Sequence, residues 1–269
     1  MLIHPATPFA AAPAERPARR CGAGILLTLL LMTGANAARA QAGTDVFIAT
    51  LRQEGRAVSI GSPVNVTRRP GSDDRPSFAP DGASLVYTSI DRDGRAAAWA
   101  VPVTGGVPVR AAREALALGG VDPASDHVWV DRTVFIRVTG DPATLHMVDT
   151  TTGKATVIAR GIGPGLVKVP HHGALNFVQV VPDGGHWLAE YTVSTAAVRR
   201  LGRLPPGAGY AAWTPRGALL TAAGSVIYRW DDGTWVVAAD LGAGGVRNIS
   251  RIVVNAAGDR LAFVADDAR

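Results

Sequence analysis

Residues 76–89, PSFAPDGASLVYTS, decide the fold class. The stretch contains an aromatic residue, Phe78, then a Pro-Asp-Gly turn at residues 80–82, and then a β-prone run at residues 85–88. Aspartate followed by glycine suits a tight turn, because glycine takes a positive φ at no steric cost. The pattern therefore predicts two antiparallel strands joined by a hairpin.

Weaker copies of this hairpin follow along the chain. With Phe78 as the reference residue, the equivalent positions are Trp129, Val169, Trp213 and Val254. The intervals between them are 51, 40, 44 and 41 residues. Self-similarity at a period of about 40–50 residues is typical of propeller blades. Apolar β-runs without a useful length of helical periodicity favour an all-β fold.

The two ends of the repeat region complete each other. The repeat that contains Val254 ends after its first half, and the second half of a repeat precedes Phe78. The two halves together make one repeat, so the repeats predict five four-stranded blades. Six blades are the alternative, because the long intervals could contain a further blade. We expect residues 46–64 to supply the outer strands and residues 252–265 the inner strands of one shared sheet. Such pairing closes the ring and removes the open sheet edges.

The first 40 residues have the pattern of a secretory signal peptide. Arginines at positions 16, 19 and 20 precede an apolar run at residues 25–32, and Ala38-Arg39-Ala40 fits a cleavage site. The run is shorter than the ~20 apolar residues that span a bilayer. We therefore predict a signal peptide at residues 1–40, a propeller domain at residues 41–269, a periplasmic or secreted location, and no stable membrane insertion after cleavage.

Charge and cysteine content narrow the classes of partner. The chain has 27 basic and 22 acidic residues, and removal of the leader leaves 23 against 21. A net charge of about +2 creates no broad field for nucleic acid, so nucleic-acid binding is not expected. The single cysteine, Cys21, lies in the leader. The mature chain therefore forms no disulfide.

The clearest repeat resembles that of the TolB-like (PD40) propellers of the bacterial envelope. The family segment is Asp-x-x-Pro-x-aromatic-Ser-Pro-Asp-Gly. The matching residues here are Asp73, Pro76, Phe78, Pro80, Asp81 and Gly82, with Ala79 in place of serine. The resemblance implies a periplasmic protein that serves an envelope complex through protein contacts. The protein that names the family has six blades and an additional N-terminal α/β domain, for which residues 41–77 are too few.

No pattern in the chain indicates catalysis. His171, His172 and His186 are interpreted as turn residues, since transition-metal sites usually need three or four ligands at workable spacing. Adjacent aspartates, such as those at residues 73–74 and 231–232, point to opposite faces of a strand and do not form a catalytic pair. There is also no Gly-x-Ser-x-Gly elbow. We assign no catalytic residue, no metal ligand and no cofactor.

The candidate binding site is the mouth of the central channel. Segments just before each inner strand line one end of a propeller. These segments supply the candidates Asp74, Arg75, Lys168, Tyr210 and Arg251. A cationic funnel with one aromatic residue fits an acidic peptide or an anionic small ligand. The alternative is a solvated rim without a ligand.

These observations predict a non-catalytic periplasmic β-propeller that acts as a protein-binding scaffold or recognition module and binds another envelope protein or peptide. The alternative is a propeller hydrolase or lyase acting on a glycan or lactone, with carboxylates in the channel or a divalent metal. Converging Asp, Glu or His side chains would favour the enzyme, whereas arginines and aromatic residues would favour a partner. The sequence leaves the question of enzyme activity open.

Overall fold

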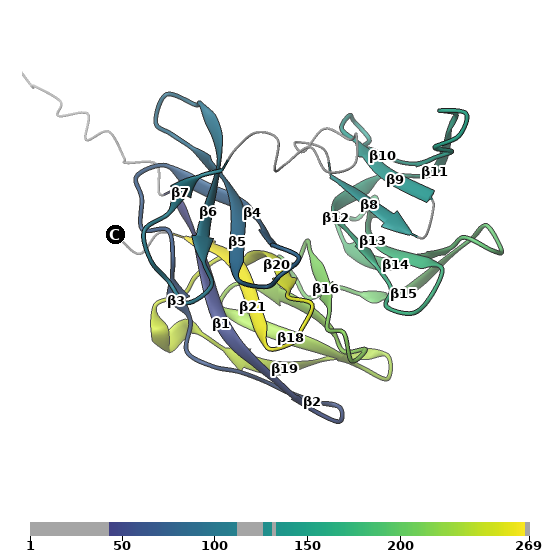
Figure 1. Ribbon diagram of the computed structural model, residues 1–269. Coiled ribbons are helices and arrows are strands. Elements are labelled where there is room, and N and C mark those ends of the chain that lie inside the picture. The colour runs from purple at the N-terminus through teal and green to yellow at the C-terminus, as the bar shows by residue number, and fades with distance from the viewer. Residues whose placement is uncertain (1–42, 112–125, 131–132, 267–269) are drawn as a thin grey trace, which may run out of the picture. The chain divides into compact units, whose positions relative to one another are not determined.

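The chain folds into five antiparallel four-stranded blades that form a β-propeller, shown as a computed structural model in Figure 1. The structure describes residues 43–111, 126–130 and 133–266, and the predicted signal peptide lies outside these ranges. Five blades, and not six, account for the described strands. The predicted all-β propeller class is therefore confirmed.

Blades 1 to 4 follow each other along the chain. Blade 1 contains β4 (Ser72–Phe78), β5 (Ser84–Ile90), β6 (Ala96–Pro102) and β7 (Val109–Arg110). Blade 2 contains β8 (His127–Val130), β9 (Thr133–Val138), β10 (Thr144–Val148) and β11 (Ala155–Arg160). Blade 3 contains β12 (Ile162–Lys168), β13 (Ala174–Val180), β14 (His186–Thr192) and β15 (Ala197–Arg203). Blade 4 contains β16 (Ala211–Trp213), β17 (Leu219–Ala223), β18 (Val226–Asp231) and β19 (Thr234–Asp240), and the 3₁₀ turn η2 (Gly242–Gly244) follows it.

The fifth blade, here called the closing blade, joins the two ends of the repeat region. Its strands are β20 (Ser250–Val254), β21 (Arg260–Asp266), β1 (Thr44–Glu54) and β2 (Ala57–Ile60), and the short β3 (Val64–Asn65) also pairs with β1. The purple β1 and the yellow β21 run side by side in Figure 1. Their register places Phe47 opposite Phe263, and the two rings stack with centroids 5.5 Å apart. The predicted ring closure is confirmed.

The hairpin that decided the fold class has the predicted geometry. Phe78 pairs with Leu85, and the Gly82 N–H donates to the Ala79 carbonyl at 2.9 Å. An oxygen of Asp81 accepts the N–H of Ala83 at 2.9 Å, and Gly82 has a φ of +68°. A positive φ at this position explains why glycine follows the aspartate.

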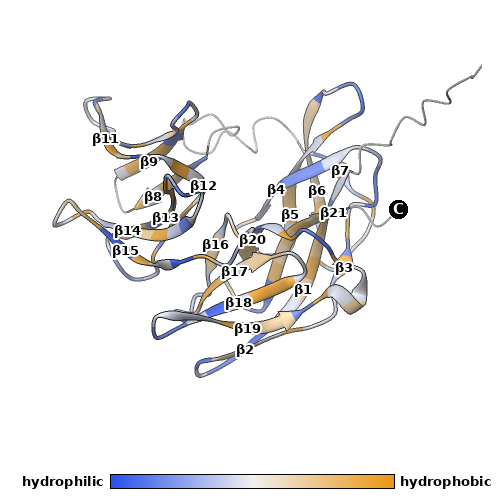
Figure 2. Ribbon diagram, turned by 180° about the vertical axis from the view of Figure 1, so that it is seen from behind, coloured by the Kyte–Doolittle hydropathy of each residue, from blue (hydrophilic) through white to orange (hydrophobic). Residues whose placement is uncertain are grey.

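The core consists of apolar clusters between adjacent blades. Among the described residues, four such clusters lie between blades 2 and 3, blades 3 and 4, blade 4 and the closing blade, and the closing blade and blade 1. Fully buried leucines and aromatics on the second strand of each blade supply much of these clusters, for example Leu85, Leu175 and Leu261. Figure 2 shows the apolar residues on the strands and many of the polar ones at the turns. No helix in the described ranges is long and apolar enough to cross a bilayer.

A buried polar group fixes the entry to blade 1. Asp45 is fully buried in β1, where its carboxylate accepts the Asn65 amide at 2.6 Å and the Thr67 hydroxyl at 3.3 Å. The Thr67 hydroxyl in turn accepts the Val46 N–H at 3.0 Å. Buried polar groups require such partners, since an unpaired one costs the fold stability. The Asn-Val-Thr segment before the clearest repeat is therefore structural.

Candidate functional site

The inner strands of three blades carry a β-bulge at the same place. The register shifts between Asp74 and Ser77 in β4, and the corresponding shifts occur in β12 and β20. The residues in these bulges with a positive φ are Arg75 (+56°), Gly165 (+88°) and Arg251 (+45°). A bulge bends the strand and redirects a side chain, which otherwise would alternate regularly between the faces of the sheet. At Arg75 and Arg251 this backbone also costs about 1–2 kcal/mol each, because an L-residue is disfavoured there.

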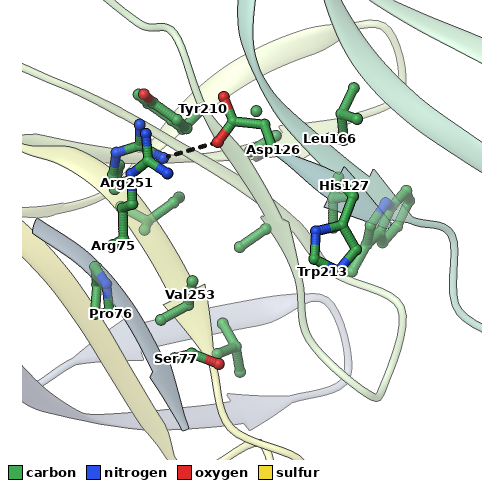
Figure 3. A pocket seen from close by; sticks show the side chains of 16 residues that line it. Arg75, Pro76, Ser77, Asp126, His127, Leu166, Tyr210, Trp213, Arg251 and Val253 are labelled. Carbon is green, nitrogen blue, oxygen red and sulfur yellow. Dashed lines mark hydrogen bonds and ion pairs between the residues drawn. The ribbon is translucent and has the colours of Figure 1, made fainter. Parts of the chain in front are cut away.

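These bulges line a cavity of about 490 Å³, shown in Figure 3. All five blades or their entry segments contribute to its wall. The contributing residues include Arg75 of blade 1, Asp126 and His127 of blade 2, Gly165 and Leu166 of blade 3, Tyr210 and Trp213 of blade 4, and Arg251 and Val253 of the closing blade. A cavity reached from every inner strand lies at the channel of a propeller.

Arg251 links three blades through its guanidinium group. Its Nε lies 2.8 Å from Oδ1 of Asp74, and its Nη1 lies 3.5 Å from Oδ1 of Asp126. The other oxygen of Asp126 lies 3.6 Å from Nη1 of Arg137 in β9. The side chains of Arg251, Asp126 and Arg137 are only 18–19% exposed, so water screens these ion pairs less than it would at the surface.

Tyr210 forms the aromatic wall of the cavity. The Arg251 guanidinium carbon lies 4.7 Å from the centre of its ring, within the range of a cation–π contact. Burial raises the pKa of the Tyr210 phenol, and the positive charge of Arg251 partly offsets this effect. Gly165 permits the ring to approach closely, since a Cβ at that position would lie 3.0 Å from Tyr210 Cδ1.

Four of the five predicted site residues gather at this cavity. Arg75, Tyr210 and Arg251 line it, and Asp74 is paired with Arg251. Lys168 does not line it; it is the last residue of β12 and pairs with Leu175, just as Phe78 pairs with Leu85. The sequence comparison set Val169 against Phe78 and was therefore one residue out of register in blade 3. That these residues bind a ligand stays a prediction.

The structure adds site residues that the sequence reasoning missed. Asp126 stands three residues before Trp129, the same offset at which Arg75 precedes Phe78. This offset, applied to every copy, would have identified Asp126 as a channel residue. Arg137 gave no comparable signal, because it reaches Asp126 from the second strand of blade 2. The site's polar network thus depends on a carboxylate and a guanidinium outside the repeat motif.

The histidines do not form a metal site in the described part of the chain. His171 and His172 line a different cavity, at the hairpin after β12, and Nδ1 of His186 lies 2.8 Å from the Ala208 carbonyl oxygen. Within the described ranges, no three His, Cys, Asp or Glu side chains are grouped so that they could hold a metal ion.

Comparison with solved structures defines the fold type. The putative TolB from Agrobacterium tumefaciens aligns over 84% of this chain and 99% of its own, with 14% identity and a TM-score of 0.50. The fold is a TolB-like β-propeller. TolB from Acinetobacter baumannii aligns over 82% of this chain and 63% of its own, with 14% identity and a TM-score of 0.39.

The propeller arrangement also occurs within a protease. The tricorn protease aligns over 72% of this chain and 26% of its own, with 11% identity and a TM-score of 0.50. No protein-family model matches the chain, and no curated protein matches it. At these identities the likenesses describe the fold alone, and the function has to be argued from the site.

Proposed function

We propose that this protein is a non-catalytic periplasmic propeller that recognises an acidic segment of another envelope protein at the mouth of its channel. The observation that carries the proposal is the cavity lined by Arg75, Tyr210 and Arg251. The predicted signal peptide supports export, and the TolB-like fold is compatible with a scaffold. In this proposal, residues 41–269 form the mature recognition module.

The charges around the cavity favour an anionic segment over a cationic one. The ion pairs around Arg251 join two arginines, Arg251 and Arg137, to Asp74 and Asp126. Arg75 also lines the cavity, so these described groups carry an excess of one positive charge. A concave site with a net charge attracts ligands of opposite sign and increases their rate of association. The Tyr210 ring adds an apolar surface that an apolar residue beside the acidic group can contact.

The network also holds the recognition surface in place. Arg251 is bonded on both sides by carboxylates from other blades, so its guanidinium is positioned before a partner arrives. A pre-positioned group loses less conformational entropy when a partner binds. A partner's carboxylate would then join a fixed arrangement of arginines and tyrosine.

The test is capture of envelope proteins on immobilised protein, with matched charge variants. Arg75→Glu reverses a charge at the cavity, whereas Arg92→Glu reverses one at an exposed residue of the turn between β5 and β6. We expect the wild type and the Arg92 variant to retain the same partner and Arg75→Glu to lose it. Retention should also weaken as salt is added. Equal retention by Arg75→Glu, or no retained protein at all, would contradict the proposal.

One observation favours the enzyme alternative as a second candidate. Asp74 and Asp126 come from different blades, and both approach the guanidinium of Arg251, which lines this cavity. Two carboxyl groups across a cavity are the usual equipment of glycan-cleaving enzymes. In that case Asp126→Asn would abolish turnover of a glycan or lactone. Metal analysis of the purified protein tests whether such an enzyme would use a divalent metal.

A further inference from the structure

A second cavity, of about 890 Å³, lies at the hairpin turns that end β12 and β16. Blades 3 and 4 both contribute to it, and the channel-mouth arginines Arg75 and Arg251 do not. Its volume falls within the range of about 300–1,000 Å³ that is usual for small-molecule sites. The chemistry of its wall indicates what it could hold.

The first unusual feature of this wall is a strained histidine. His171 follows Pro170 in the β12–β13 turn and has a φ of +60°. In the corresponding turns of blade 1, blade 4 and the closing blade the residue at positive φ is a glycine, namely Gly82, Gly217 and Gly258. The turn hydrogen bonds place His172 at the glycine position, so in blade 3 the positive φ falls one residue earlier, on His171. A bulky residue in this conformation costs stability, and such strain is characteristic of positions kept for function. Together with its place in the cavity wall, this backbone makes His171 a candidate ligand-binding residue.

The second feature is a cluster of charged hydrogen-bonding groups. Glu190 of β14 is paired with Arg199 of β15 at 3.1 Å. Arg216 donates one N–H to the Gln53 carbonyl at 2.8 Å. A guanidinium has five N–H donors, so each arginine retains donors beyond these bonds. Two arginines against one glutamate leave an excess of one positive charge, which matches a ligand with a single anionic group.

The third feature is an aromatic surface held in a fixed orientation. The Trp213 indole N–H donates to Oδ1 of Asn176 at 2.8 Å, and Asn176 is fully buried. Asn176 in turn donates to the Ala189 carbonyl at 3.3 Å. The indole is thus fixed by an anchored partner, and Trp213 lines this cavity beside polar groups.

We propose that this cavity binds a short acidic saccharide. One sugar ring would pack its C–H face on Trp213, because pyranose rings have an apolar face that matches an indole. The carboxylate would pair with Arg199 and Arg216, since guanidinium groups bind carboxylates in a planar, bidentate geometry. Glu190 and the imidazoles of His171 and His172 would bond the hydroxyl groups, which are both donors and acceptors. The arginines, the glutamate and the histidines of this site do not line the channel-mouth cavity, and Trp213 is the one residue that the two described cavities share. The proposal does not rest on the function proposed for the channel mouth.

The test is calorimetric titration of the purified protein with cellobiouronic acid and with the neutral disaccharide cellobiose. We expect binding of the acidic disaccharide and an affinity for cellobiose that is weaker by about tenfold or more. Arg199→Gln should weaken binding of cellobiouronic acid by about the same factor. Arg92→Gln and Arg75→Glu should leave it unchanged, which separates this site from the channel mouth.

The strained turn provides a second, independent readout. His171→Gly removes the imidazole and relieves the strained backbone, so we expect its melting temperature to equal or exceed that of the wild type while its affinity for the disaccharide falls. A purely structural histidine would instead lower the melting temperature. The proposal fails if cellobiose binds as well as the acid, if Arg199→Gln binds normally, or if a tetra-aspartate peptide binds and the saccharide does not.

Discussion

Replacement of Phe263 by alanine should remove much of the stability that ring closure provides. Phe263 is fully buried in β21, and its ring stacks on Phe47 of β1 at 5.5 Å with an interplanar angle of 4°. Truncation of a buried phenylalanine costs about 3–5 kcal/mol. For a domain of this size, each kcal/mol corresponds to about 2–4 °C, so the melting temperature should fall by about 6–20 °C.

Urea unfolding followed by tryptophan fluorescence measures this loss. The control is Val237→Ala in β19, where the valine is 64% exposed and the expected loss is below about 0.5 kcal/mol. A double-mutant cycle with Phe47→Ala should give a coupling energy of about 0.5–1.5 kcal/mol. A loss below about 1 kcal/mol for Phe263→Ala, or no coupling to Phe47, would refute the pairing of β1 with β21 as the basis of closure.

Three further predictions concern the cavity wall and the buried ionisable groups. Gly165→Ala places a Cβ 3.0 Å from Tyr210 at a backbone φ of +88°, which an L-residue disfavours. Urea unfolding should therefore show a loss of about 1–2 kcal/mol in the free energy of unfolding. No loss would mean that Tyr210 does not need the close approach that Gly165 permits. Burial raises the pKa of Asp73 above its ordinary 3.8, so ionisation destabilises the folded state as the pH rises from 3.8 through the raised value. Over that pH range Asp73→Asn should gain stability relative to the wild type. If the difference in unfolding free energy between the two proteins did not change with pH, the raised pKa of Asp73 would be refuted. Burial also raises the pKa of Tyr87 from 10.0 to about 12, so the wild type should lose stability between pH 10 and 12, and Tyr87→Phe should lose less. If Tyr87 were not responsible, unfolding curves would show the same loss of stability in the wild type and in Tyr87→Phe across that pH range.

The closure and the blade count could be predicted because they depend on local patterns. Residues 46–49 and 261–264 are apolar runs at opposite ends of the repeat region, and each needs a neighbour on its open edge. The turn at Asp81-Gly82 could be predicted in the same way, because the residues that form it are adjacent in the sequence. Features of this kind follow from composition and period alone.

The site was less predictable because its geometry depends on bulges and on contacts between blades. Lys168 stands at the reference position of blade 3, opposite Leu175, as Phe78 stands opposite Leu85. The other three basic or aromatic candidates stand three residues before their reference positions, and this difference in offset explains why Lys168 does not line the cavity. The pairing of Arg251 with Asp126 joins positions 125 residues apart, and no local pattern records it. The strained backbone at Arg75 is also invisible in sequence, because arginine gives no signal for a positive φ.

The pairing of β1 with β21 has a consequence for how the molecule is made. Phe47 and its partner Phe263 are 216 positions apart, so a growing chain carries β1 without its β21 partner until residues 260–266 have been synthesised. Contacts of such long sequence separation form late and slow the folding reaction. The closing blade is therefore complete only after β21 has been made, and removal of that one strand would leave β1 and β20 with no shared neighbour.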